Sequence, residues 1–296
     1  MQVFERGWLS ANNILFAADD GATLVDTGYC THAPQTIALV THALTQAPLT
    51  RIINTHLHSD HCGGNAALKQ RYPQAQIFIP PGESEAVRVW DEDALSYRAT
   101  AQTCPRFMFD GIIAPGTQIM LGNSSWQVLS APGHDPHSVV LYCPQHKLLI
   151  SADALWQNGF GLVFPELDGE QAFDEVAATL DLIADLQVDV VIPGHGAPFN
   201  DCAGAIARAR SRLEAHVTNP AKHAFHAVKA LLMYRMMAEQ RADAAALQTE
   251  IASARLFQQV AQRWFDEPAS STVARACDEL VARGELVRQG AVIALA

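Results

Sequence analysis

Three histidines and an aspartate stand in one heptapeptide, Thr55-His56-Leu57-His58-Ser59-Asp60-His61, directly after the apolar run Arg51-Ile52-Ile53-Asn54. Side chains two residues apart on an extended segment share a face, so His56 and His58 can bind one ion together. Asp60 and His61 follow where the chain must turn, and they can reach a second ion or a substrate. Neutral imidazole and carboxylate suit zinc and its first-row neighbours, so the heptapeptide predicts a metal site.

Three further candidate ligands each follow an apolar, strand-like run. His134 comes soon after residues 126–129, and Asp153 and His195 each close a run of their own. Open α/β architectures place ligand sites along the carboxyl edge of their sheets, so the four segments should converge there. These positions argue against the simpler alternative of a solvated histidine-rich loop. Seven candidate ligands predict two metal positions.

The ordered ligand set closely resembles the metallo-β-lactamase-fold hydrolase superfamily, in which HxHxDH is followed by a distant His, Asp and His. The resemblance covers roughly residues 10 to 200 and implies an α/β fold, the αββα sandwich of two packed sheets flanked by helices. It also implies two ligand sets and a bridge: His56, His58 and His134 for the first metal, Asp60, His61 and His195 for the second, and Asp153 between them.

Asp26, in Leu24-Val25-Asp26-Thr27-Gly28, matches a further position of the family. The resemblance implies that it is hydrogen-bonded to ligand groups rather than bound to metal. The alternative is a turn-forming aspartate before Gly28, since Asp and Gly are common at turns. Asp60 and Asp26 are thus the carboxylates expected to serve catalysis, the first directly and the second through the ligands.

The predicted chemistry is hydrolysis by a hydroxide that bridges two divalent cations. Zinc is the favoured metal, with iron and manganese as alternatives, and one zinc ion alone lowers the pKa of bound water to about 7. Asp60 would hand the proton on to the leaving group. Cys62 is the alternative nucleophile, but Gly63 and Gly64 suggest a tight turn where a small buried side chain is convenient, so a structural role is favoured.

The superfamily resemblance favours a small-molecule substrate, an acyl thioester or a related ester, similar to that of hydroxyacylglutathione hydrolase. The glutathione-binding pattern of that enzyme is not recognisable here. The alternatives are a metal-dependent ribonuclease, a lactonase, an iron-dependent sulfur dioxygenase with one metal, and a catalytically weak sensor. A sensor without catalysis would be expected to lack one of the metal ligands of the superfamily pattern, and all of them are present.

Two aromatic-rich stretches are equally placed to line the substrate pocket or merely to cover the sandwich. They are residues 82–116, with Trp90, Tyr97, Phe107, Met108 and Phe109, and the loop 156–164 after Asp153. The basic residues that could hold a glutathione or phosphate group are Arg88, Arg98 and Arg106, together with any that reach over from the C-terminal region, and none of them is diagnostic.

Composition indicates a cytoplasmic enzyme without a membrane partner. The chain has 296 residues and 49% hydrophobic content, which suffices for one large domain and a small one. Residues 1–6 lack the basic start and long apolar run of a secretory signal. The six cysteines form no CxxC pair and indicate reduced thiols.

A change in charge predicts a domain boundary near Cys202. Residues 1–202, the predicted catalytic domain, carry eight Lys and Arg against 22 Asp and Glu, whereas residues 203–296 carry twelve against nine. Within the first part we expect a hairpin and three helices: strands at 13–16 and 22–25 with a turn at 19–21, and helices at 34–46, 64–71 and 170–186.

The second part is predicted to be helical and to end in a β-hairpin. We expect helices at 203–217, 221–237, 244–265 and 271–283, then two strands turning at Gln289-Gly290. This order resembles the small winged-helix-like domain of one branch of the superfamily. DNA is not expected as a partner, because the net charge is −11. The domain is expected to cap the active site or to pack against a second subunit in a homodimer.

Overall fold

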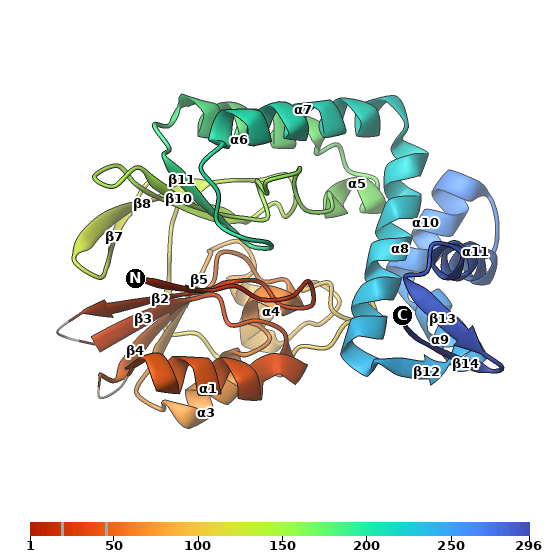
Figure 1. Cartoon of the computed structure of the whole chain (residues 1–296), viewed down its shortest axis with the longest axis horizontal. Helices are drawn as coiled ribbons and strands as arrows, with labels where there is room; N and C mark the ends of the chain where they lie inside the picture. Colours follow the sequence, from red (N-terminus) through yellow and green to blue (C-terminus); the bar gives the residue numbers. More distant parts are fainter. Residues whose placement is uncertain (19–20, 45–46) are drawn as a thin grey trace.

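Two β-sheets pack face to face, with helices on their outer faces (Figure 1), in the computed structural model, which describes residues 1–18, 21–44 and 47–296. The first sheet has the strand order β1 (Gln2–Phe4), β2 (Asn13–Ala18), β3 (Gly21–Val25), β4 (Leu49–Ile53), β5 (Gln76–Ile79) and β6 (Gly111–Ile112). The second has the order β11 (Val190–Pro193), β10 (Leu148–Ala152), β9 (Val139–Cys143), β8 (Ser124–Ser130) and β7 (Gln118–Leu121). The predicted αββα sandwich is confirmed.

The central strands are largely apolar because both faces of each sheet are covered. In β4, Ile53 packs between the sheets, whereas its neighbour Ile52 packs beneath α1 (Ala33–Leu44) and α3 (Asn65–Arg71). The second sheet repeats this alternation under α6 (Phe173–Asp185) and α7 (Cys202–Thr218), with Ile150 of β10 turned inward and Leu149 turned outward.

Most of the predicted elements of the first part are present. Strands β2 and β3 form the predicted antiparallel hairpin. The helices expected at 64–71 and 170–186 are α3 and α6. Residues 19–20 of the expected turn and residues 45–46 of the expected first helix lie outside the described residues.

Parallel pairing brings the ligand-bearing loops to one edge of the sandwich. Strands β3 to β6 run parallel in the first sheet, and β10 pairs parallel with β11 in the second. Their carboxyl ends therefore meet at the same edge. The short helical elements η1 (Cys30–His32), α2 (Ser59–Cys62), α4 (Ser84–Val89) and α5 (Phe164–Asp168) lie in the loops between these strands.

The C-terminal part forms an apolar core of its own, to which α5 of the first part adds Leu167. It contains α8 (Pro220–Glu239), β12 (Arg241–Asp243), α9 (Ala244–Ser253), α10 (Arg255–Phe265), α11 (Ala269–Ala282), β13 (Leu286–Gln289) and β14 (Val292–Leu295). The terminal hairpin turns at Gln289-Gly290 as predicted. The winged-helix likeness and the boundary near Cys202 stay predictions, and α7 packs with α6 on the sandwich.

Two details of the predicted C-terminal part are wrong. The single helix expected over 244–265 is broken at Ala254, whose extended backbone (φ −73°, ψ 141°) separates α9 from α10. Strand β12, which completes a three-stranded sheet beside β14, was not expected, because three polar and small residues carry no strand pattern.

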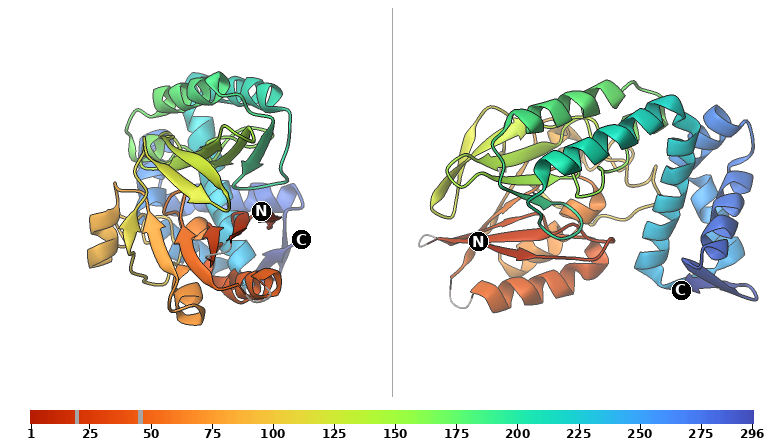
Figure 2. Two further views of the ribbon diagram at one scale, coloured as in Figure 1. Left: turned by 90° about the vertical axis from the view of Figure 1, so that its left-hand side faces the viewer. Right: turned by 45° about the horizontal axis from the view of Figure 1, so that its top comes forward.

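Helix α8 runs across the open end of both sheets (Figures 1 and 2). It therefore stands opposite the edge where the ligand-bearing loops meet. Among the described residues, no helix is long and apolar enough to cross a membrane.

Three histidines gather at the corner between α7 and α8. The rings of His216 and His223 lie 4.7 Å apart, and His223 Nε2 accepts a hydrogen bond from the backbone N–H of Val163 at 3.2 Å. Burial, together with neighbouring cationic groups, lowers the pKa of His216 and His226 to about 4 and that of His223 to about 3. The corner is therefore packed with neutral imidazoles at neutral pH.

We expect this corner to make the protein sensitive to acid. His223 titrates near 6.5 when unfolded and near 3 when folded, so the unfolded state binds the extra proton as the pH falls from 7 toward 4. The free energy of unfolding should fall by about 2 kcal/mol from this residue between pH 7 and pH 5. Urea unfolding of His223→Gln should show a shallower pH dependence than the wild type. His42→Gln, which removes an exposed histidine on α1, should keep the wild-type slope, and equal slopes in all three proteins would contradict the assignment.

Candidate metal centre

The seven predicted ligands converge in two groups at the carboxyl edge of the sheets. His56, His58 and His134 form one group, and Asp60, His61, Asp153 and His195 form the other. The nearest ligand atoms within each group lie within 4.8 Å of one another. All seven residues are buried except His58, which is half-buried.

Asp153 lies between the two groups. Its Oδ1 is 3.4 Å from His61 Nε2, and its Oδ2 is 3.4 Å from His134 Nε2. This placement is the one that a carboxylate shared by two cations requires. The bridging role of Asp153 stays a prediction that this geometry supports.

The donor atoms fit divalent cations. The buried Nε2 atoms of His56 and His61 have no hydrogen-bond partner, and His58 Nδ1 lies 2.8 Å from His134 Nε2. Buried polar atoms without partners are costly, and a cation that accepts their lone pairs would remove that cost. Burial and the neighbouring imidazoles lower the pKa of His56 well below its usual value and that of His58 to about 4. Both rings are therefore neutral, which is the form that binds metal.

The expected reason for the pairing of His56 and His58 is wrong. Strand β4 ends at Ile53, and His58 immediately precedes α2, so the two histidines do not share a strand face. Their rings are nearly perpendicular, at 85°, with centroids 4.7 Å apart. They still belong to one group because the loop after β4 turns both toward His134.

Unusual backbone conformations aim the ligands. Asp26 and Ala152 both have positive φ, 57° and 45°, a region that costs a non-glycine residue about 1–3 kcal/mol. Ala152 also lies at a shift in the register between β10 and β11, directly before Asp153. The backbone also approaches two ligands closely at glycines. A Cβ on Gly194 would collide with the carboxylate of Asp153, and a Cβ on Gly161 would collide with the ring of His134.

Hydrogen bonds from outside the two groups hold the ligands in place. Asp26 accepts from Thr55 N–H at 2.9 Å and from His61 Nδ1 at 2.8 Å, which turns His61 Nε2 toward Asp153. His134 Nδ1 donates to the carbonyl oxygen of Leu162 at 2.5 Å. Asp26 thus makes the hydrogen bonds to ligand groups that were expected of it. Its role in orienting the metal ligands stays a prediction.

Three aromatic residues touch the ligands and were not identified as doing so from the sequence. The Trp156 indole N–H donates to Asp153 Oδ1 at 3.1 Å, and the Tyr234 hydroxyl of α8 donates to Asp60 Oδ2 at 3.3 Å. Trp8, from the loop before β2, stacks on the ring of His195 with centroids 5.4 Å apart. Trp8 and Tyr234 are far from the motifs in sequence, so no local pattern could have placed them.

A cavity of about 590 Å³ opens onto the two groups. Its apolar wall comes from the loop after Asp153 and from α8: Trp156, Phe160, Leu162, Phe164, Ala230, Leu231, Met233 and Met237. The sequence left open whether the loop 156–164 lines a pocket or covers the sandwich, and the structure shows that it lines this cavity. The stretch 82–116 contributes only Gln102 among the described residues, and Tyr97 and Phe107 are buried in the core beneath the first sheet.

The basic residues named from the sequence do not line this cavity. Arg88 pairs with Glu85, and Arg98 pairs with Glu92 and Asp93, all at the surface. Arg106 borders a separate hollow beside Lys69 and Met108. The prediction that these residues could hold an anionic part of a substrate in the pocket is therefore wrong.

Cys62 is fully buried beside the first core. Its Sγ lies 3.3 Å from the carbonyl oxygen of Leu57 and 3.2 Å from the Tyr97 hydroxyl. Burial raises the pKa of this thiol well above its usual value, which disfavours the nucleophilic thiolate. The surroundings of Cys62 agree with the structural role that was expected.

Comparison with known proteins agrees with this geometry. The family described as Metallo-beta-lactamase superfamily matches residues 6–195. Hydroxyacylglutathione hydrolase from Dechloromonas aromatica is 31% identical over 144 residues, 49% of this chain and 43% of that protein. A linear primary-alkylsulfatase from a Pseudomonas species is 25% identical over 222 residues, 63% of this chain and 41% of that protein. The chain thus spans less than half the length of both relatives.

A solved structure covers almost the whole chain. A β-lactamase domain protein from Burkholderia ambifaria superposes with a TM-score of 0.58 at 20% sequence identity, covering 99% of this chain and 91% of that one. This similarity extends the shared fold to the C-terminal part.

Asp26→Asn should weaken metal binding while leaving the fold intact. The amide keeps the shape of the side chain but removes the charge that orients His61, and losses of this kind cost about 10- to 100-fold in metal affinity. Titration against a chelator measures the change. Asp189→Asn, which removes an exposed carboxylate before β11, is the control, and equal metal affinity in both variants would argue against the role of Asp26.

Proposed function

Because the chain belongs to the metallo-β-lactamase superfamily and carries its His/Asp metal-binding site, we propose that it hydrolyses a small acyl thioester or a related ester with two bound metals. The observation that carries the proposal is the pair of ligand groups, with Asp153 between them, at the floor of an apolar cavity. Relatives named hydroxyacylglutathione hydrolase support the reaction class.

Two divalent cations would supply a water activated near neutral pH and would polarise the substrate carbonyl. Their proposed ligands are His56, His58 and His134 for one ion, Asp60, His61 and His195 for the other, and Asp153 for both. Zinc is the favoured metal, and iron and manganese suit the same donors.

The proposed role of Asp60 is to carry a proton to the leaving group. Its carboxylate borders the cavity, with Oδ2 3.0 Å from His195 Nε2 and 3.3 Å from the Tyr234 hydroxyl. Both contacts fix the orientation of the carboxylate. An oriented group at the cavity wall can meet the departing sulfur or oxygen without rearrangement.

The walls of the cavity favour an acyl group over a nucleic acid. Phe160, Phe164 and Met233 offer apolar surface that excludes water and suits a hydrocarbon chain. Residues 1–202, which contain the ligands, carry a charge of −14, eight basic residues against 22 acidic ones, and this charge repels a phosphate backbone. The cavity therefore supports thioester or ester hydrolysis over the ribonuclease alternative.

Replacement of Asp153 tests the proposed mechanism. Metal-loaded protein should release thiol from a panel of acyl thioesters, and Asp153→Ala should lose most turnover because the carboxylate between the two ligand groups is gone. Cys62→Ala should stay within a few-fold of the wild type, since its thiol faces the core. An inactive Cys62→Ala together with an active Asp153→Ala would reject the mechanism, and a wild type that releases no thiol would reject the substrate class.

Tyr234→Phe should lower kcat while leaving metal content unchanged. Burial, reinforced by Asp60 and Asp153, raises the pKa of Tyr234 well above its usual value, so its hydroxyl stays a donor to Asp60. Loss of such a hydrogen bond commonly costs about 10- to 100-fold. Tyr142→Phe is the matched control, because that hydroxyl donates to the carbonyl of Gln187, outside the cavity. Equal kcat values in the two variants would remove Tyr234 from the mechanism.

A further inference from the structure

The cavity wall contains an arginine that has no acidic partner among the residues described in the structure. Arg212 of α7 donates from Nη1 to the carbonyl of Asn158 at 3.4 Å, and its Nη2 lies 3.2 Å from His226 Nε2. Two neighbouring arginines of the same helix are paired, Arg208 with Asp201 and Arg210 with Asp181. Arg212 therefore presents to the cavity a positive charge that makes no ion pair with the described residues. Outside the ligand groups, the carboxylate that also lines the cavity is Glu285, which pairs with Arg283 at 4.0 Å.

The environment of this guanidinium makes a counter-ion favourable. The Arg212 side chain is partly buried, and His226 is neutral at neutral pH because burial holds its pKa at about 4. A partly desolvated charge without a partner is unfavourable, and an anionic ligand would supply charge-assisted hydrogen bonds. The net charge of −11 repels an anion, and a local cation offsets part of that repulsion.

The arginine and the ligand groups lie toward opposite ends of the cavity. Five of the residues of α8 that line the cavity follow a helical period on one face of the helix: His226, Ala230, Met233, Tyr234 and Met237. His226 contacts Arg212, and Tyr234, eight residues later, contacts Asp60. Eight residues of α-helix correspond to about 12 Å. Ala230 and Leu231 line the interval between the two contacts with apolar surface.

We propose that Arg212, assisted by His226, binds an anionic group at the far end of the substrate, a carboxylate, sulfate or phosphate about 12 Å along α8 from the contact with the ligand groups. This inference rests on the proposed function. The substrate class is then an elongated acyl thioester or ester with an apolar middle and a charged end. The charge lies either on the acyl chain or on the thiol or alcohol that leaves.

Matched thioesters test this specificity. The first compounds are N-acetylcysteamine thioesters of acids of equal length that end in a methyl group or in a carboxylate, and a second series carries the carboxylate on the thiol. In the wild type, one carboxylate series should have the lower KM. In Arg212→Gln that KM should rise by about 10- to 100-fold, as expected for a lost hydrogen bond to a charged group, while the methyl-ended thioesters keep theirs.

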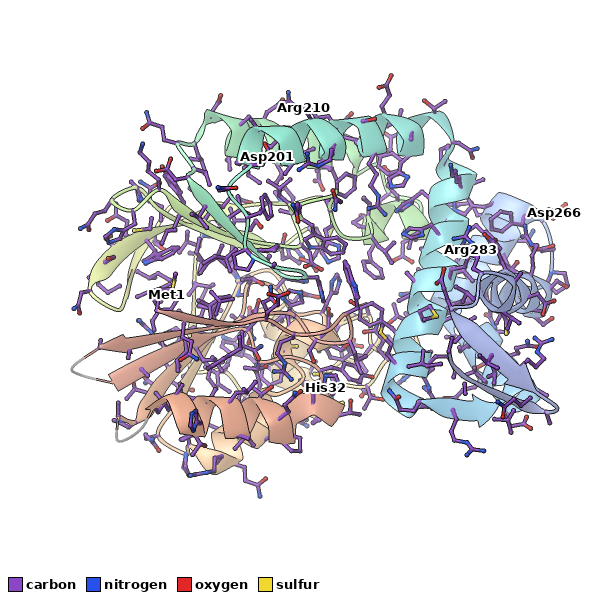
Figure 3. The ribbon with its side chains drawn as sticks, in the orientation of Figure 1. Met1, His32, Asp201, Arg210, Asp266 and Arg283 are labelled. Carbon is purple, nitrogen blue, oxygen red and sulfur yellow. The ribbon has the colours of Figure 1, made fainter. Side chains whose placement is uncertain are left out.

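Arg210→Gln is the matched control because it removes the same charge from the same helix. Arg210 is labelled on α7, at the top of the molecule in Figure 3, and it does not line the cavity. This variant should retain the wild-type preference for the carboxylate. An equal loss in both variants would show a general effect of charge and overturn the proposal.

Binding separates this proposal from the proposed reaction. Ketone analogues, in which a methylene replaces the thioester sulfur, cannot be hydrolysed, and their binding to the metal-loaded wild type is measured by calorimetry. Tighter binding of a carboxylate-ended ketone without any thioester hydrolysis would leave the anion site standing and reject the thioesterase. Equal binding of methyl-ended and carboxylate-ended ketones, whichever end carries the charge, would overturn the anion site even if thiol is released. This comparison uses the wild type alone, so it decides the question even if Arg212→Gln fails to fold.

Discussion

Burial of carboxylates and imidazoles in one small volume is the constraint on which the rest of this structure depends. Each such group loses hydration when the sandwich closes, and each must find a hydrogen bond or a cation in return. Asp26, Leu162, Trp156 and Tyr234 supply hydrogen bonds, and they come from three separate parts of the chain: the end of β3, the loop after Asp153, and α8. The ligand atoms left without protein partners, above all Nε2 of His56 and His61, are those that face the proposed metal positions.

The same constraint explains why the backbone is strained at the edge of the sheets. Asp26 follows β3 and Ala152 ends β10, and the direction of both strands is fixed by burial on both faces, so the chain must turn abruptly to aim the carboxylates of Asp26 and Asp153. The cost of each positive φ is small beside the burial of the adjoining strands. A rigid apolar sandwich can therefore hold polar groups in positions that a flexible loop would not keep.

The sequence predicted those features that depend on local pattern. The ligands follow apolar strands at recognisable spacings, and the parallel order of the strands made their convergence foreseeable. Pattern alone could not separate the loop 156–164 from the stretch 82–116, because an aromatic residue looks the same whether it lines a cavity or fills a core. Trp8 and Tyr234 escaped prediction because the loop before β2 and α8 reach the site only through tertiary packing. A basic residue from the C-terminal region was expected as a possibility, but only the packing of α7 identifies it as Arg212.

Helix α8 has one face in the cavity and another in the C-terminal core. One face presents Ala230, Tyr234 and Met237 to the cavity, while Val228, Leu232 and Met236 pack into the C-terminal core. A helix that is apolar on two faces belongs between two packed bodies, and α8 has that position at the end of the sandwich (Figure 2). Packing against the C-terminal core holds α8 in place. The position of α8 in turn determines the length of the cavity and the polarity of one of its walls. Changes at Ala230 or Met237 of the cavity face should thus alter the shape of the cavity without disturbing the ligands, because the ligands belong to the sandwich and, of these three residues, only Tyr234 hydrogen-bonds one of them.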